Sequence, residues 1–101
     1  MTKVVWTLGA EKDVQAIYER LESWEEGIGD RFYAEVLACL DLLEAFPKIG
    51  PVVHQGRVRR VLVFNRNYGL YYVLEDRGIV LHALLDLRLD PGDIRKRLEG
   101  I

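Results

Sequence analysis

The hydrophobic periodicity of this chain changes at its midpoint. Before residue 47, apolar residues recur every three or four positions, whereas after residue 56 they follow the runs and alternation typical of β-strands. Pro47 and the pair Gly50-Pro51 separate the two halves, and proline disfavours helix because its ring removes the amide hydrogen. The pattern therefore predicts an α+β fold, in which a helical segment precedes a run of strands.

The first half predicts a helical hairpin. A short β-prone run at residues 3–8 leads into a helix at about residues 10–26, whose apolar stripe is Val14, Ile17, Leu21 and Trp24. Gly27-Ile28-Gly29 ends that helix, and Asp30 is expected to cap the next one. The second helix should span about residues 31–46, with Phe32, Val36, Leu40 and Leu43 on its apolar face. Two such helices bury their stripes best as an antiparallel pair.

The second half predicts an antiparallel meander. Three β-rich runs at residues 57–64, 67–75 and 78–88 are separated by segments of hairpin length, and a short helix should follow at residues 93–98. The expected order is β-α-α-β-β-β-α, with the helical hairpin packed on a mainly antiparallel sheet. We expect a single domain over residues 1–101, because this length supports one hydrophobic core.

Strand alternation predicts which side chains share a face of the sheet. On the last strand, the side chains expected away from the helices are Val80, His82, Leu84, Asp86 and Arg88, and those expected beneath the helices are Leu81, Ala83, Leu85 and Leu87. On the middle strand, one face should carry Tyr68, Leu70, Tyr72 and Leu74. Arg59 and Arg60 are adjacent and must point to opposite faces, so one of them should lie at an edge or pair with an acid such as Asp86.

Composition excludes several classes of protein. Cys39 is the only cysteine, so an intramolecular disulfide and a cysteine-based zinc cluster are excluded, and a buried thiol is the simplest expectation. His54 and His82 are too far apart for a helical metal motif, and Gly27-Ile28-Gly29 lacks the third glycine of a phosphate loop. No apolar run reaches the roughly 18 residues of a membrane span. We therefore expect a cytoplasmic protein without cofactor, metal or membrane partner.

Charge divides unevenly along the chain. Residues 1–50 carry 5 basic and 10 acidic side chains, whereas residues 51–101 carry 9 basic and 6 acidic ones. Four arginines occur between residues 57 and 66 without any acid, namely Arg57, Arg59, Arg60 and Arg66. Their guanidinium groups suit an anionic partner, although a solvated strand edge that discourages aggregation would show the same pattern. The net charge of −2 does not indicate direct binding of nucleic acid.

A sheet face with arginines, tyrosines and a histidine could also hold a phosphodiester. Arginine would stabilise charge that develops at phosphorus, while a tyrosine or histidine handled the proton of a 2′-hydroxyl. The alternative is a structural ion-pair network of Arg60, Asp86 and Arg88 that closes the sheet. The residues alone leave both hypotheses open.

The order of these motifs resembles the RelE/ParE superfamily of toxins from type II toxin–antitoxin systems. The matching segments are Glu26-Gly27, Phe32-Tyr33, residues 40–47, Gly50-Pro51, Val58-Arg59-Arg60-Val61-Leu62-Val63, Tyr68-Gly69-Leu70-Tyr71-Tyr72 and Leu87-Arg88-Leu89-Asp90-Pro91. They cover about residues 10–98, and the series is most similar to the ParE-like, plasmid-stabilisation branch. The resemblance implies a small toxin that a cognate antitoxin neutralises, with operator DNA contacted only through that antitoxin.

The two branches imply different activities. ParE-like members inhibit DNA gyrase without hydrolysis, whereas RelE-like members cleave mRNA on the ribosome. Leu89 occupies a position where the superfamily commonly has a second arginine, and no tyrosine or histidine follows Asp90. The resemblance therefore favours a gyrase inhibitor, with a ribosome-dependent mRNA endonuclease and an inactive antitoxin-binding module as alternatives.

Each hypothesis has its own candidate residues. For the nuclease, the candidate catalytic side chains are Arg60, Tyr72, His82 and Arg88. For contact with the target or the antitoxin, the candidates are Arg57, Arg59, Arg60, Arg66, Tyr68 and Arg88. The antitoxin could place a helix in a groove of the toxin or add a strand to its sheet, since both are common modes of peptide recognition.

Overall fold

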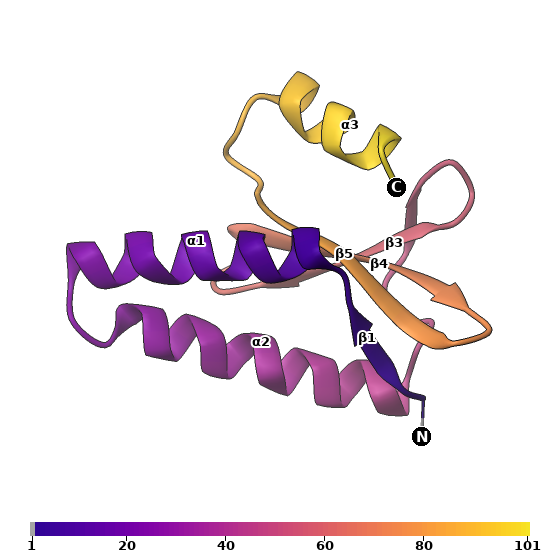
Figure 1. Ribbon diagram of the computed structural model, residues 1–101, viewed down its shortest axis with the longest axis horizontal. Helices are drawn as coiled ribbons and strands as arrows, with labels where there is room; N and C mark the ends of the chain where they lie inside the picture. Colours follow the sequence, from indigo (N-terminus) through magenta and orange to yellow (C-terminus); the bar gives the residue numbers. More distant parts are fainter. Residues whose placement is uncertain (1) are drawn as a thin grey trace.

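A five-stranded sheet carries two long helices on one side and a short third helix on the other (Figure 1). The computed structural model describes residues 2–101. The elements along the chain are β1 (Val4–Trp6), α1 (Leu8–Trp24), α2 (Ile28–Ala45), β2 (Val52–His54), β3 (Val58–Val63), β4 (Tyr68–Glu75), β5 (Gly78–Asp86) and α3 (Pro91–Glu99). The strands lie in the order β1-β5-β4-β3-β2, with β1 parallel to β5 and all other neighbours antiparallel.

This architecture confirms the predicted α+β class and every predicted element, and it adds β2. The predicted order lacked β2 because its three residues follow Gly50-Pro51, a pair that we interpreted as part of a loop. β2 forms only two residue pairs with β3. A strand of three residues is too short to show an alternation of polar and apolar side chains. It is stabilised by its pairing with the edge of β3.

The turn between α1 and α2 differs from the prediction that Asp30 caps the second helix. α2 begins at Ile28, after Gly27 in the left-handed region at φ +93°. The carboxylate of Glu22, on α1, accepts hydrogen bonds from the backbone N–H groups of Gly27, Gly29 and Asp30 at 2.7–3.2 Å. The Asp30 carboxylate instead accepts the Tyr18 hydroxyl at 2.6 Å. A carboxylate from the preceding helix thus satisfies the free amides at the start of α2.

Two hydrophobic cores lie on opposite faces of the sheet. The larger core joins the hairpin to the sheet, and its buried residues are Ala10, Val14, Ile17, Leu21, Phe32, Val36, Leu40, Leu43, Val63, Tyr68, Leu70, Tyr72, Ile79, Leu81 and Leu84. The smaller core lies beneath α3 and consists of Val58, Tyr71, Val73, Ala83, Leu85 and Leu98. The predicted faces of the middle strand are confirmed, because Tyr68, Leu70 and Tyr72 lie together beneath the hairpin.

A β-bulge at His82 reverses the predicted faces of the last strand after that residue, whereas Leu81 lies beneath the hairpin as predicted. Tyr72 pairs with Leu81 and Tyr71 pairs with Ala83, so His82 is an extra residue on β5. An inserted residue shifts the alternation of everything after it by one position. Leu84 therefore lies beneath the hairpin while Ala83 and Leu85 lie beneath α3, which is the reverse of the prediction.

The short helix α3 is held against α1 and β5 by one carboxylate. Asp13 of α1 accepts two hydrogen bonds from Arg97 of α3, at 3.0 and 2.7 Å, and one from the backbone N–H of Leu84 at 3.1 Å. Asp90 caps α3 through the N–H of Gly92. Within residues 2–101, no helix has the length and apolarity that crossing a membrane would require.

Candidate functional site

Four polar side chains meet where β5 ends, and we call them the Arg88 cluster: Arg20, Tyr68, Asp86 and Arg88. Arg88 donates from Nε and Nη2 to the two carboxylate oxygens of Asp86, each at 2.9 Å. The Tyr68 hydroxyl accepts hydrogen bonds from Arg88 at 3.3 Å and from Arg20 at 3.5 Å. Arg20, on α1, also lies 3.7 Å from Asp86. The bulge at His82 permits this arrangement, because it places Asp86 opposite Tyr68 on the hairpin side.

Two guanidinium groups share one carboxylate in this cluster, so its formal charge is positive. The hydrogen bonds from Arg88 lower the pKa of Asp86, and the same contact raises the pKa of Arg88. The Asp86 side chain is 15% exposed, whereas that of Arg88 is 52% exposed and packs over the Tyr68 ring at 5.6 Å. The cluster therefore holds a partly exposed guanidinium in a defined orientation at the surface.

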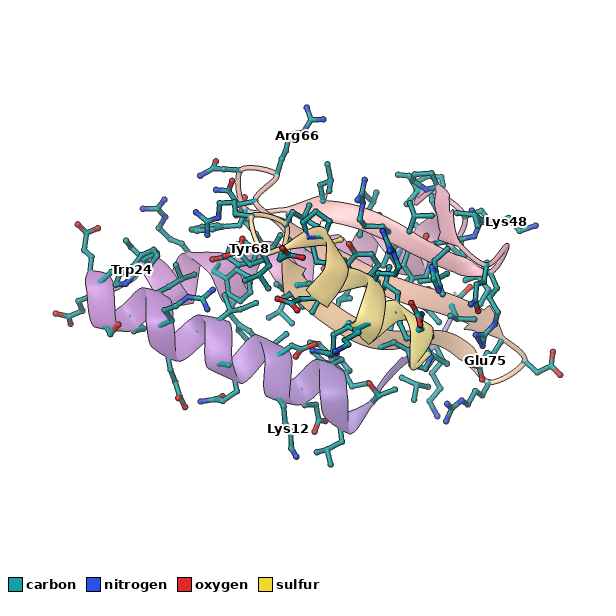
Figure 2. The ribbon with its side chains drawn as sticks, turned by 90° about the horizontal axis from the view of Figure 1, so that it is seen from above. Lys12, Trp24, Lys48, Arg66, Tyr68 and Glu75 are labelled. Carbon is teal, nitrogen blue, oxygen red and sulfur yellow. The ribbon has the colours of Figure 1, made fainter. Side chains whose placement is uncertain are left out.

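A pocket of about 220 Å³ opens beside the Arg88 cluster. Its lining includes Trp24, which is 63% exposed, together with Phe64, Tyr68 and Arg88. Arg31 also lines the pocket, and its Cζ lies 6.0 Å from the centre of the Phe64 ring. Figure 2 shows Trp24 at the end of α1 that leads into the α1–α2 turn, on the same side of the molecule as Tyr68. Trp24 thus lies at the rim of the pocket rather than in the core.

The arginines of β3 and of the turns on either side of it make no ion pair among residues 2–101. Arg57 donates only to the carbonyl of Ile101, at 3.4 Å. Arg59 donates to the carbonyls of Lys48 and Gly50, at 3.2 and 2.8 Å. Arg66 projects away from the β3–β4 turn (Figure 2). No acidic side chain within residues 2–101 therefore neutralises these arginines.

Arg60 does not form the predicted network with Asp86 and Arg88. Arg59 lies opposite Tyr72 and Arg60 lies opposite Tyr71, which confirms that the two arginines face opposite sides. Arg60 consequently lies on the α3 side, where its stem passes so close to Gly69 that a Cβ there would lie 3.0 Å from Arg60 Cδ. The Arg60 Nε is buried without a hydrogen-bond partner. Asp86 pairs with Arg88 and Arg20 instead, and Arg20 is a residue that the sequence pattern did not indicate.

Tyr72 and His82 lie apart from the Arg88 cluster. Tyr72 is fully buried, and its hydroxyl donates to the carbonyl of Pro47 at 2.8 Å and accepts from the N–H of Gly50 at 3.0 Å. Burial raises the pKa of Tyr72. His82 Nε2 lies 3.9 Å from a Glu75 carboxylate oxygen, too far for a hydrogen bond, and burial lowers the pKa of His82 in spite of that acid.

A groove of about 700 Å³ runs between α2 and β3. Its rim carries three exposed apolar side chains, namely Leu42, Ile49 and Leu62. Cys39 lies in its wall, and burial raises the pKa of that thiol to about 11. The thiol is therefore protonated at neutral pH and contributes apolar surface to the groove. Within residues 2–101, no group of acidic, histidine or cysteine side chains is arranged to hold a metal ion.

Comparisons with known proteins agree with this architecture. A family model described as the ParE toxin of the type II toxin–antitoxin system, parDE, matches residues 4–87. A solved structure described as the chromosomal ParDE toxin–antitoxin system from P. aeruginosa superposes with a TM-score of 0.76 at 15% sequence identity. That match covers 85% of this chain and 96% of the other chain, and it shows a shared fold. No curated protein sequence matched the chain.

Proposed function

The chain belongs to the ParE toxin family of type II toxin–antitoxin systems, and on this premise we propose that it inhibits DNA gyrase and that a cognate antitoxin neutralises it. On this proposal the toxin acts by binding its target, without hydrolysing a nucleic acid. Gyrase works on chromosomal and plasmid DNA, so the proposed site of action is the bacterial cytoplasm.

The observation that carries this proposal is the separation of the candidate catalytic side chains. A general acid or base and an arginine that stabilises the same phosphodiester must reach the same few atoms. Arg60 lies on the α3 side of the sheet, whereas Tyr72 is buried beneath the hairpin with its hydroxyl already bonded to Pro47 and Gly50. This separation favours a binding protein over the ribosome-dependent endonuclease.

The exposed arginines support recognition of an acidic protein surface. The Arg88 cluster presents a guanidinium that Asp86 and Tyr68 orient, and β3 presents arginines without an acidic partner. Oriented guanidinium groups bind carboxylates in two-point geometry and contribute strongly to protein interfaces. We assign contact with gyrase or the antitoxin to Arg57, Arg59, Arg60, Arg66 and Arg88, and to the buried Tyr68 the role of orienting Arg88.

A supercoiling assay tests the proposal. Purified toxin should inhibit supercoiling of relaxed plasmid by gyrase at micromolar concentration, and the protein encoded by the adjacent gene should relieve that inhibition. Arg88→Gln should weaken inhibition, whereas the matched variant Arg95→Gln, which alters an exposed arginine of α3, should not. Gyrase that is unaffected at micromolar toxin would overturn the proposal.

Two further measurements distinguish the alternatives. Messages in a translation extract should stay intact, and cuts in codon register that are abolished by changing Arg60, His82 or Arg88 would establish the endonuclease instead. Expression without the antitoxin should arrest growth. Unimpaired growth would identify an inactive toxin fold that only binds the antitoxin.

A further inference from the structure

The pocket beside the Arg88 cluster is formed by several separate segments of the chain. The end of α1, the start of α2, the β3–β4 turn at residues 64–67 and the segment after β5 all contribute to its lining. Leu21, Ile28 and Phe64 supply apolar surface. A mostly apolar wall with a few polar groups is typical of small-molecule sites. The volume of about 220 Å³ is below that of pockets for drug-sized ligands, so this pocket suits one ring and one acidic group.

Both charged side chains in the lining are arginines. Arg31 and Arg88 line the pocket, and no acidic residue does. Arg31 makes no ion pair within residues 2–101. Arg88 contacts Asp86 and Tyr68 through Nε and Nη2, whereas its Nη1 makes no hydrogen bond to any residue from 2 to 101. Both arginines therefore have N–H groups available for an anion.

Each of these guanidinium groups lies over an aromatic ring. The Cζ atom of Arg31 is 6.0 Å from the centre of the Phe64 ring, and that of Arg88 is 5.6 Å from the centre of the Tyr68 ring. The centres of the two rings are 6.3 Å apart. Contact with a ring restricts a guanidinium, so less conformational entropy is lost when it binds a ligand. The two arginines are held over neighbouring rings, where one anionic group can contact both.

The β3–β4 turn holds an unfavourable backbone conformation at the pocket. Phe64, Asn65 and Arg66 lie in succession in the left-handed region, at φ 50°, 58° and 65°. Asparagine tolerates this region better than phenylalanine or arginine does. The N–H of Asn67 donates to the carbonyl of Phe64 at 3.2 Å, and the carbonyl of Asn67 accepts from Leu87 at 2.9 Å. Strained backbone that is maintained in this way is common at ligand-binding sites, and here it places two asparagine side chains in the lining.

Trp24 offers a flat apolar surface that the core does not use. Its side chain is 63% exposed at the end of α1 and lines the pocket (Figure 2). An exposed tryptophan stacks well on a planar ring, because the contact removes apolar surface of both rings from water. A ligand ring against Trp24 would leave its acidic group free to contact the arginines.

We propose that this pocket binds a small aromatic anion, in which a planar ring carries a carboxylate or a phosphate. The ring packs against Trp24 and the apolar lining, and the anionic group accepts hydrogen bonds from Arg31 and Arg88. The side-chain amides of Asn65 and Asn67 are available to polar substituents on the ring. The inference does not depend on the target of the toxin, because it concerns a site that the chain carries when alone.

A titration of the isotope-labelled chain, followed by NMR, tests the site. The probes are benzoate and phenyl phosphate, and Trp24→Phe identifies the indole N–H signal of Trp24. That signal should shift and saturate, with dissociation constants of roughly 0.1–1 mM for probes of this size. Benzyl alcohol lacks the charge and acetate lacks the ring, so each should bind at least about tenfold more weakly. A Trp24 signal that does not move at probe concentrations well above this range would overturn the proposal.

Substitutions test which side chains hold the ligand. Arg31→Gln and Arg88→Gln should each weaken benzoate binding about tenfold, because each removes a charged hydrogen-bond donor. Trp24→Ala should weaken it about fivefold or more. The matched controls are Arg95→Gln, on α3, and Leu8→Ala, at the opposite end of α1, and both should leave the affinity unchanged. All five side chains are exposed, so we expect every variant to fold.

Two further results bear on the proposal. If both arginine variants bind benzoate as well as the unmodified chain does, the binding is non-specific and the assigned site is wrong. Adenosine monophosphate also combines a planar ring with a phosphate, but the sugar between them makes it larger than the pocket allows. Binding weaker than that of phenyl phosphate supports a small aromatic acid. Tighter binding would overturn the size limit and assign the site to a nucleotide.

Discussion

The arginines that join the elements of this protein contrast with the arginines of β3. Arg88 and Arg97 each form a two-point contact with one carboxylate: Arg88 with Asp86 at the end of β5, beside α1, and Arg97 of α3 with Asp13 of α1. Arg57, Arg59, Arg60 and Arg66 have no acidic partner among residues 2–101. The same residue type therefore serves two purposes in this protein. Paired arginines stabilise the packing of helices on the sheet, whereas the unpaired ones hold charge available for a partner.

The largest effect is expected from breaking the contact that holds α3. Asp13→Ala leaves the guanidinium of Arg97 and the backbone N–H of Leu84 without their shared acceptor. We expect the free energy of unfolding to fall by about 2–3 kcal/mol, because the lost hydrogen bonds include charged ones. Urea denaturation measures this change. Asp41→Ala, which removes an exposed acid of α2, is the matched control and should cost less than about 0.5 kcal/mol.

A smaller effect, which depends on pH, is expected at the Arg88 cluster. Since Arg88 lowers the pKa of Asp86 in the folded chain, ionised Asp86 stabilises the fold above the ordinary carboxyl pKa, and this contribution is lost as the pH falls through the lowered pKa. Asp86→Asn should therefore cost about 1 kcal/mol or less at pH 7, because Arg88 is half exposed and solvent screens the pair.

Measurements of stability across the acid range check this sign. The difference between the unmodified chain and Asp86→Asn should shrink below about pH 4, where the carboxylate of the unmodified chain becomes protonated. The matched variant Asp76→Asn, in the exposed β4–β5 turn, should show no such dependence. A difference that grows on acidification would mean that Arg88 is not the group that stabilises the charge of Asp86.

The smallest effect on stability is expected at the unpaired arginines. Arg66→Gln removes a charge that makes no ion pair among residues 2–101, so the free energy of unfolding should change by less than about 0.5 kcal/mol. The same substitution should weaken binding of the antitoxin at low salt. Thermal unfolding and a binding titration together test this prediction. A loss of stability as large as that of Asp13→Ala would mean that Arg66 stabilises the fold as much as the paired arginines do.

Local patterns in the chain predicted more of the fold than of the site. The apolar stripes of α1 and α2 and the alternation of β4 depend on residues a few positions apart, and all three were confirmed except at Trp24, which is exposed at the end of α1. The bulge at His82 could not be predicted, because it depends on how Tyr71 and Tyr72 pair across two strands. That one residue moved Asp86 to the hairpin side and so determined which arginines it meets. The roles of Arg57, Arg59, Arg60, Arg66, Tyr68 and Arg88 in binding remain predictions.

Periodicity, turn residues and charge are properties of neighbouring positions, so they were enough to predict the types of the elements, their order apart from β2, and the excess of arginine around β3. Packing between distant segments places Glu22 at the start of α2, Asp13 against Arg97 of α3, and Arg20 and Tyr68 beside Arg88. It also ends β2 after two residue pairs with β3. Each of these features is a contact between segments whose positions are set by packing, and no local pattern encodes such a contact.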